Sequence, residues 1–251
     1  MGAIPDEVSA YISSLHYGTV QKMKISIRRI LPYISTAEVG LSFFLIFIVL
    51  IVFILPPLGL VGIAGRLVVD IVFTLLLVSG TASTSESKVA FVIVAGISII
   101  TLVFRWSGSF FYLPVVGVLD NIATIVVILL LCTLILARVF KKGPITFRRI
   151  EGAIAAYLLL GLAWAYAYQL IADSYPAGFA GALTASPGAS SWTYFSFVTL
   201  ATLGYGDITP VHPIARSLAT AEAITGQLYL AILIARLVSQ ELFNRQQKPE
   251  N

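Results

Sequence analysis

Long apolar stretches separated by short polar segments dominate the pattern of this chain. A helix that crosses a bilayer needs about 20 mostly apolar residues. Six stretches approach or exceed that length: 39–55, 61–80, 89–104, 115–139, 152–172 and 214–242. Pro56 and Pro57 end the first stretch, which predicts a tight hairpin between the first two. The pattern therefore predicts an all-α membrane protein with six transmembrane helices.

A seventh apolar segment, residues 192–201, is too short to cross. About ten residues make a helix of about 15 Å, half of the hydrocarbon core, with Ser190 and Ser191 as candidate N-caps. The segment is therefore predicted to be re-entrant. The loop before it, residues 174–190, is rich in Gly, Ala, Ser and Pro and has no charge, so we expect irregular structure and no chemistry there.

Composition and charge place the chain in a bilayer and orient it. Hydrophobic residues make up 58% of the chain and charged residues only 11%, unlike a soluble domain. The positive-inside rule puts clusters of basic residues in the cytoplasm, and both termini with them. The protein is expected in the plasma membrane. Because the charge follows the membrane ends, no nucleic-acid partner is expected. The two clusters are Lys22, Lys24, Arg28 and Arg29, and Arg138, Lys141, Lys142, Arg148 and Arg149.

Charge and helix-breaking residues divide the chain into five parts. Residues 1–37 form a cytoplasmic segment, in which 21–33 pattern as a helix on an anionic lipid surface or as a solvated basic arm. Residues 38–140 form a four-helix part, and 141–150 a linker broken by Gly143 and Pro144. Residues 151–242 hold the outer helix, the re-entrant helix, a loop and the inner helix, with Thr146 as a candidate cap for the helix that begins near Phe147. Residues 243–251 are a short tail.

The loop after the re-entrant segment carries the candidate chemistry. Non-helical backbone at membrane depth is tolerated only where protein or a water-filled cavity satisfies it. A dehydrated cation needs oxygen ligands in place of its water, and successive carbonyls can supply them if they all point to one side. Gly204 and Gly206 permit the positive φ angles that such an arrangement requires. The Thr202 hydroxyl can add another oxygen at the inner end.

Residues 199–207, Thr-Leu-Ala-Thr-Leu-Gly-Tyr-Gly-Asp, resemble the potassium-channel signature sequence. The chain is similar to prokaryotic-type six-transmembrane potassium channels of the voltage-gated-like, pore-loop superfamily. The resemblance implies a tetramer with three identical partner subunits and membrane lipids around it, no cofactor, and K+ as the one metal ion. The implied K+ site comprises Thr202, Leu203, Gly204, Tyr205 and Gly206. Ala201 and Leu203 depart from the threonine and valine that the family often carries.

Several residues around the loop are candidates for its support. By resemblance, Asp207 forms the outer mouth and accepts a hydrogen bond from Tyr194 or Trp192 of an aromatic cuff. Glu222 is expected behind the loop, bonded to Thr199 or to another hydroxyl of the re-entrant helix. Val198 stands where some bacterial channels place a carboxylate.

The inner helix holds the candidate gate. Gly226 is a hinge, because glycine weakens a helix by about 1 kcal/mol relative to alanine, a small residue for close packing, or both. Leu230, Ile234 and Val238 share one stripe with Gly226 and are candidates for an apolar constriction. Arg236 is expected to pair with Glu151, with lipid headgroups as its alternative partner.

The four-helix part lacks the features of a voltage sensor. A sensor carries arginines at every third position of its fourth helix, and residues 121–137 contain none. The in-span charges Asp70, Arg105 and Asp120 are expected to form a polar network, with Arg66 as a local partner of Asp70. Cys132 is the only cysteine and is expected in the core.

The sequence therefore predicts a potassium-selective channel subunit with little intrinsic voltage sensing, and no enzyme. No His, Cys or carboxylate set has the spacing of a metal or nucleophile site, and His16 and His212 lie outside the apolar stretches. The alternatives are a nonselective cation channel of the same fold, a secondary transporter and a non-conducting regulatory subunit.

Overall fold

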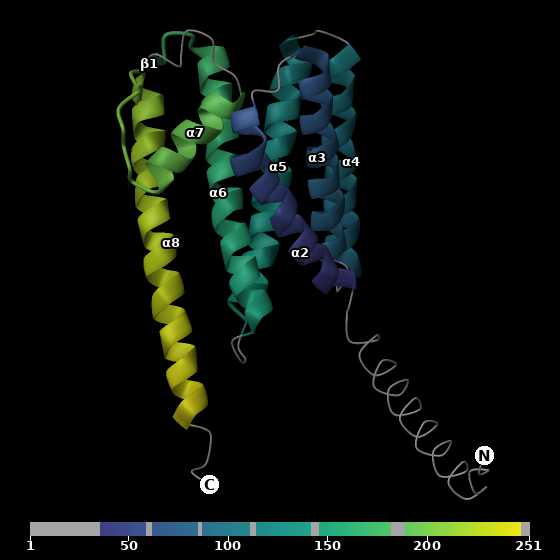
Figure 1. The fold of residues 1–251 in the computed structure, drawn as a ribbon, viewed down its shortest axis with the longest axis vertical. Coiled ribbons are helices and arrows are strands. Elements are labelled where there is room, and N and C mark those ends of the chain that lie inside the picture. Colours follow the sequence, from purple (N-terminus) through teal and green to yellow (C-terminus); the bar gives the residue numbers. More distant parts are fainter. Residues whose placement is uncertain are drawn as a thin grey trace, which may run out of the picture.

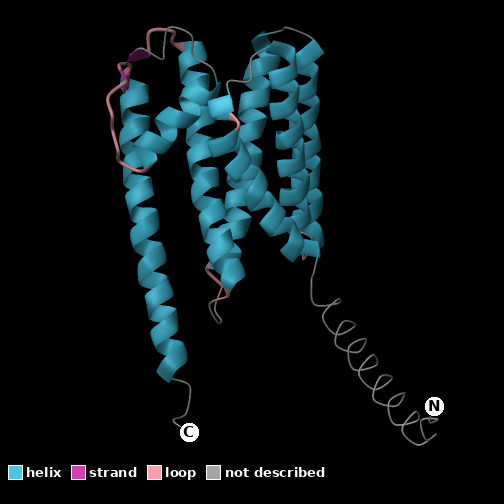
Figure 2. Ribbon diagram, in the orientation of Figure 1, coloured by secondary structure: helices cyan, strands magenta, loops and turns pink. Residues whose placement is uncertain are grey.

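A computed structural model describes residues 36–58, 62–84, 87–110, 114–141, 146–181 and 189–246. In these ranges the chain is mostly helical, with two three-residue strands and short loops, as Figures 1 and 2 show. The predicted segment 21–33, the Gly143–Pro144 break and residues 247–251 lie outside the described residues. The elements are α2 (Thr36–Val49), η2 (Leu50–Ile54), η3 (Pro56–Leu58), α3 (Gly62–Ser83), α4 (Lys88–Phe110), α5 (Pro114–Val139), α6 (Phe147–Ser174), β1 (Phe179–Gly181), α7 (Ala189–Leu200), β2 (Ile208–Pro210) and α8 (Pro213–Gln246).

Five of the described helices, α3, α4, α5, α6 and α8, are long and apolar enough to cross a membrane. The first predicted span differs, because its apolar part, Val39–Ile54, is shorter than a full crossing. It continues α2 through the π-helical turn η2 before Pro56 ends it. The chain is a membrane protein, with five spanning candidates and one shorter apolar helix among the described residues.

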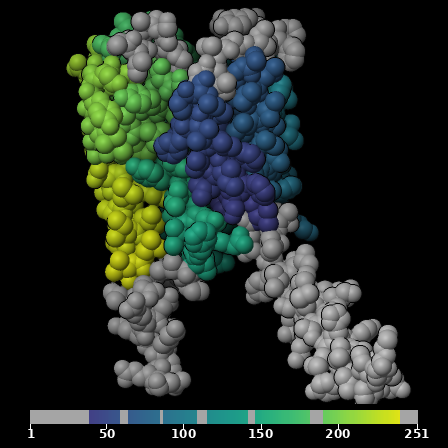
Figure 3. Space-filling view, in the orientation of Figure 1, coloured from purple at the N-terminus to yellow at the C-terminus, as the bar shows by residue number. Residues whose placement is uncertain are grey.

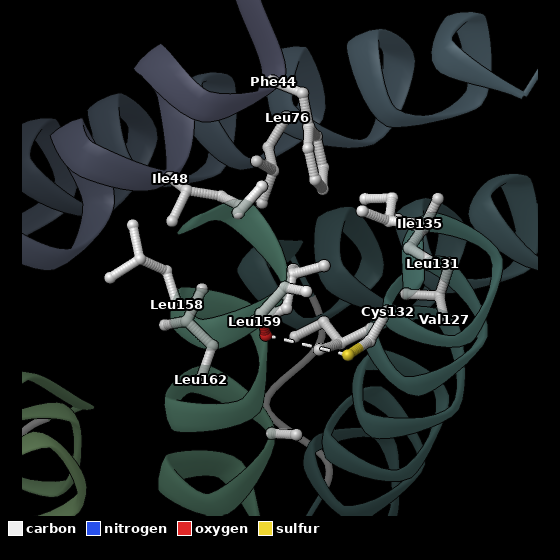
Figure 4. Close-up of a cluster of buried hydrophobic side chains, with 14 of the residues drawn as sticks. Phe44, Ile48, Leu76, Val127, Leu131, Cys132, Ile135, Leu158, Leu159 and Leu162 are labelled. Carbon is white, nitrogen blue, oxygen red and sulfur yellow. Dashed lines mark hydrogen bonds between the residues drawn. The ribbon is translucent and has the colours of Figure 1, made fainter. Parts of the chain in front are cut away.

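The apolar core lies where α2, α3, α5 and α6 meet. Figure 4 shows Phe44 and Ile48 of α2 above Leu159 of α6, with Leu131 of α5 beside them. Cys132 is buried there, and its Sγ lies 3.7 Å from the carbonyl oxygen of Ala156, as the core assignment predicted. The core thus joins the four-helix part to α6.

The predicted polar network is present among α3, α4 and α5. Arg105 Nε lies 2.8 Å from Asp70 Oδ1, and Arg105 Nη1 lies 3.7 Å from Asp120 Oδ2. Arg105 Nη1 also donates to the Tyr166 hydroxyl of α6 at 3.4 Å. The guanidinium is therefore held between two carboxylates, and Asp70 has in Arg105 a partner from another helix.

Two predicted helix starts change in detail. Helix α6 begins after Thr146 as expected, but the Thr146 side chain makes no capping hydrogen bond. Helix α7 begins at Ala189, so Ser190 and Ser191 lie in its first turn and are not its caps. The sequence pattern does not separate Ala189 from the two serines that follow it, so the first residue of the helix could not be predicted.

Residues 174–190 are not wholly irregular, contrary to the expectation. Strand β1 pairs antiparallel with β2, with Gly181 opposite Ile208 and Phe179 opposite Pro210. The partner strand lies almost thirty residues further along the chain, and three residues are too few for an alternating pattern. The sequence therefore gave no local signal for this pairing.

The end of α2 reaches the half-length helix α7 of the same chain. Phe53, in η2, lies with its ring centroid 6.1 Å from that of Phe197 in α7, and Figure 3 shows α2 and η2 beside the α7 region on this face. Phe197 in turn fills the space beside Gly161 of α6, where an added Cβ would lie 2.6 Å from the ring. The four-helix part is thus packed on its own α6 and α7.

We expect this contact to form within one subunit of any oligomer. In a Cys132→Ser background, the Phe53→Cys, Phe197→Cys variant should be joined by a short bifunctional maleimide to a product of single-chain mass. Phe43→Cys with Phe197→Cys is the matched control, because Phe43 is equally exposed on α2 but stacks on Phe47. A ladder of dimers and higher species on a denaturing gel would instead place α2 against a neighbouring subunit.

Candidate functional site

The loop Thr202–Asp207 begins where α7 ends, and hydrogen bonds to the last turn of that helix fix its start. Thr202 N donates to Thr199 O at 2.9 Å, and Leu203 N donates to Val198 O at 2.8 Å. Helix ends leave carbonyls without intrahelical donors, and here the loop supplies those donors. The direction in which the loop leaves α7 is therefore set by the helix itself.

Positive φ angles occur at every second residue of the loop. The φ angle is 57° at Thr202, 58° at Gly204 and 80° at Gly206, and Thr202 is the one described non-glycine residue with positive φ. An extended strand alternates its carbonyls between two sides, whereas alternation of left- and right-handed residues turns successive carbonyls to the same side. The predicted glycine conformations are confirmed, and Thr202 shares them, which is unusual for a β-branched residue.

The loop is open to the outside of the single chain. Leu203 is 58% exposed and Tyr205 is 67% exposed, and an added Cβ at Gly204 or Gly206 would meet nothing within 4 Å. At the inner end, Gln227 Nε2 of α8 donates to Thr202 Oγ1 at 3.1 Å. The loop therefore lies along one face of the chain, with its inner end bonded to α8.

At the outer end, Asp207 is held from two sides. The Tyr194 hydroxyl donates to Asp207 Oδ2 at 2.7 Å, which is the first of the two predicted donors, and this bond raises the pKa of Tyr194 to about 12. Asp207 Oδ1 accepts from Ile208 N at 3.1 Å. Trp192 is buried and instead packs on Phe179 of β1, with ring centroids 4.8 Å apart.

Gly181 is a close neighbour of the loop that the sequence analysis missed. Its φ is 131°, and an added Cβ would lie 1.9 Å from the backbone oxygen of Asp207. Only a residue without a side chain allows β1 to approach so near. The glycine stands in a Gly-rich segment, so its special conformation had no distinguishing sequence signal.

Glu222 lies fully buried behind α7, as predicted, and of the two expected alternatives its partner on α7 is another hydroxyl of that helix, Ser196, and not Thr199. Its Oε1 is 2.5 Å from Ser196 Oγ, and its Oε2 accepts from the Tyr168 hydroxyl of α6 at 2.5 Å. Ser196 Oγ is also 2.7 Å from the carbonyl oxygen of Gly161. The two helices stay in contact over one turn: Glu222 of α8 contacts Ser196 of α7, and four residues further along each helix Gly226 contacts Leu200. Tyr168 was not identified from the sequence, because it reads as an ordinary core position of α6.

Gly226 is packed tightly against the end of α7. An added Cβ would lie 2.2 Å from the backbone oxygen of Leu200, and α8 runs as one helix through this position. Of the two interpretations of Gly226, the structure supports the small residue for close packing. The stripe below it stays open in the single chain, with Leu230 42%, Ile234 60% and Val238 53% exposed.

The predicted pair of Arg236 and Glu151 is wrong. Arg236 Nη2 donates to the backbone oxygen of Phe140, just past the end of α5, and its guanidinium lies 4.9 Å from the Phe140 ring centroid. Glu151 accepts from Ser42 Oγ of α2 at 3.2 Å. A cation is favoured at a helix C-terminus, where carbonyls lack donors, and this end of α5 outcompetes the carboxylate. Arg236 still joins α8 to the start of the linker.

Within the described ranges, no group of three or more His, Cys, Asp or Glu residues could hold a metal ion. Ligands for a cation at this site would therefore be backbone and hydroxyl oxygens of the loop. Such oxygens suit hard, weakly polarising cations and offer nothing to a soft transition metal.

Comparison with known proteins places the site in a matched region. Residues 156–241 match the family described as "Ion channel". The chain is 35% identical over 80 residues, 30% of its length, to the inward rectifier potassium channel Kirbac3.1 of Paramagnetospirillum magnetotacticum. It is 33% identical over 91 residues, 35% of its length, to two pore potassium channel c of Oryza sativa subsp. japonica.

These matches cover only 24% and 20% of the two relatives' own lengths. No solved structure matches the chain at a significant level. The family and the two relatives are ion channels, a class of protein that is not an enzyme. Residues 156–241, which match the family, comprise most of α6 and all of α7, the loop and the span of α8.

Proposed function

We propose that this chain is a subunit of a potassium-selective channel in which four identical copies surround one pore. Residues 202–207 of each copy form the ion filter, α7 is the re-entrant pore helix, and α6 and α8 are the outer and inner helices. The similarity of residues 156–241 to ion channels and the similarity of about a third of the chain to two potassium channels support this assignment. Helices before α6 lie outside residues 156–241.

The observation that carries the proposal is the alternating positive φ at Thr202, Gly204 and Gly206. This backbone turns the carbonyls of Thr202, Leu203, Gly204 and Tyr205 toward one axis, where four copies replace the hydration shell of K+. The Thr202 hydroxyl, bonded to Gln227, marks the inner end. Asp207, tied to Tyr194, braces the outer end.

The exposed faces in the single chain fit this assembly. Leu203 and Tyr205 project from the loop, and most of the apolar part of α8 is exposed in the single chain. In a tetramer the Tyr205 side chain points away from the ions toward a neighbouring α7. Leu230, Ile234 and Val238 then line the cytoplasmic half of the pore and can close it by excluding water.

Flux from vesicles tests the proposal directly. Purified protein in vesicles loaded with K+ should release K+ and exchange rubidium, while an equal Na+ gradient gives little flux, and barium should block. Equal K+ and Na+ flux would indicate a nonselective channel of this fold. Slow, saturable and barium-insensitive flux would indicate a transporter, and no flux at all in folded tetramers a non-conducting subunit.

We expect conductance to depend weakly on voltage. The fourth helix of the four-helix part, α5, carries no arginine between residues 121 and 137, and Arg105 is held by Asp70 and Asp120. Moving one charge across 100 mV yields about 2.3 kcal/mol, but this arrangement offers no mobile charge. Planar-bilayer recording should give a shallow conductance–voltage curve, and a slope of several gating charges per subunit would contradict this.

A further inference from the structure

The buried contacts of Glu222 contain more short oxygen–oxygen pairs than an ionised carboxylate can satisfy. Ser196 Oγ lies 2.5 Å from Glu222 Oε1 and 2.7 Å from Gly161 O. A serine hydroxyl has one proton, and a backbone carbonyl has none to give. If Ser196 donates to Glu222, the contact with Gly161 O is a bare pair of oxygens; if it donates to Gly161, the contact with an ionised Glu222 is bare.

We infer that Glu222 is a neutral carboxylic acid that donates its proton from Oε1 to Ser196 Oγ. Ser196 then donates to Gly161 O, and Tyr168 donates to Glu222 Oε2. Each of the three protons lies on one contact and every contact holds one proton. A proton on Oε2 fails, because Tyr168 would lose its acceptor and Ser196 would again have two contacts for one proton.

The surroundings of Glu222 agree with a neutral group. Its side chain is fully buried, and neither of the salt bridges among the described residues involves it. A buried charge is costly unless it is paired and hydrogen-bonded. Glu222 is faced by a tyrosine hydroxyl from α6 and a serine hydroxyl from α7, which serve a carboxylic acid without a counter-charge.

The proton makes Glu222 a positioning residue for the loop. Through one chain of hydrogen bonds it ties α8 to α7 at Ser196, to α6 at Tyr168, and through Ser196 to Gly161. The last turn of α7, only two residues beyond Ser196, supplies the Val198 carbonyl that holds Leu203. The effect on ion binding rests on the proposed function, whereas the position of the proton does not.

Infrared spectroscopy of the full-length protein in lipid vesicles tests the proton without any measurement of conduction. A protonated carboxyl absorbs apart from a carboxylate, and the Glu222→Gln variant should lose one such band at neutral pH. Glu151→Gln is the matched control, a described glutamate with Ser42 as its partner, and should leave that band in place. An unchanged band in Glu222→Gln would overturn the inference.

Two further variants test the assigned partners. Ser196→Ala removes the acceptor of the Glu222 proton and should shift the band to higher frequency, because the carboxyl O–H loses its hydrogen bond. Tyr168→Phe removes the donor to Oε2 and should also raise the frequency of the C=O stretch. A band unmoved by both variants would overturn the hydrogen-bonded chain.

Flux measurements on the same preparations test the positioning role. Glu222→Gln keeps an N–H donor toward Ser196 and an acceptor for Tyr168, so K+ selectivity should be retained, whereas Glu222→Ala should lose it. Loss of selectivity in folded Glu222→Gln tetramers would overturn the role of the neutral form. If the parent protein itself lacks selective flux, the proposed function fails and the infrared result still decides the proton.

Discussion

Alanine at Gly204 or Gly206 is expected to abolish selective K+ flux while the subunits still fold and assemble. Both glycines have positive φ, 58° and 80°, where an L-residue costs about 1–2 kcal/mol. In a ring of four subunits the cost is multiplied by four, about 4–8 kcal/mol on the same estimate. We expect the loop to relax by turning carbonyls away from the axis, which removes the oxygens that replace water around K+.

The cause of that loss can be separated from simple crowding. In the single chain an added Cβ at either position meets nothing within 4 Å, so strain at φ is the intrachain effect. D-alanine, introduced by peptide ligation, adds the same methyl group but favours positive φ. Selective flux should survive with D-alanine and fail with L-alanine. Selectivity retained in both L-alanine variants would refute the filter assignment.

Two features of the fold could be predicted from the sequence: the long helices and the conformations of two glycines in the loop. Long apolar stretches must be helices in lipid, because every backbone group needs an internal partner, and α3 through α8 lie close to the predicted ranges. The conformations of Gly204 and Gly206 could also be predicted, because glycine has no Cβ and adopts positive φ angles without the steric cost that other residues carry.

What the sequence did not reveal depends on contacts between distant elements. Thr202 adopts positive φ although its side chain disfavours it, because hydrogen bonds to α7 and Gln227 fix it on both sides. Arg236 could have paired with Glu151, lipid or a helix end, and only the three-dimensional fold, which brings its side chain to the end of α5, decides for Phe140. The pairing of β1 with β2 likewise joins two segments with no shared pattern.

Helix α8 shows how such a contact changes an interpretation. A glycine in the middle of a span permits both bending and close approach, and sequence alone leaves the two interpretations equal. The structure adds a neighbour on one side: the Leu200 backbone at the end of α7, which itself carries the loop. A change at Gly226 is therefore expected to act on the loop proposed as the filter, through α7, before it acts on any bend in α8.

Gly226→Ala should accordingly reduce both thermal stability and K+ selectivity. The added methyl would lie 2.2 Å from Leu200 O and 3.0 Å from Leu200 Cδ1, so α8 and α7 must separate. Overpacking of this kind costs typically about 1–3 kcal/mol, and the upper end applies because the obstructing atom belongs to backbone. The gain in helix propensity, about 1 kcal/mol, does not offset it.

Gly96→Ala provides the matched control for this prediction. Gly96 also lies within a long apolar helix, α4, but an added Cβ there meets nothing within 4 Å. That variant should keep its flux and melt at the same or a slightly higher temperature, because only the propensity gain remains. Thermal unfolding in detergent and K+ against Na+ flux in vesicles give the two measurements. The opposite result would be a Gly226→Ala variant that melts like Gly96→Ala and keeps its selectivity, with a change only in the fraction of open channels. That result would show that Gly226 acts as a hinge, because alanine would then have removed bending and not disturbed the contact with Leu200.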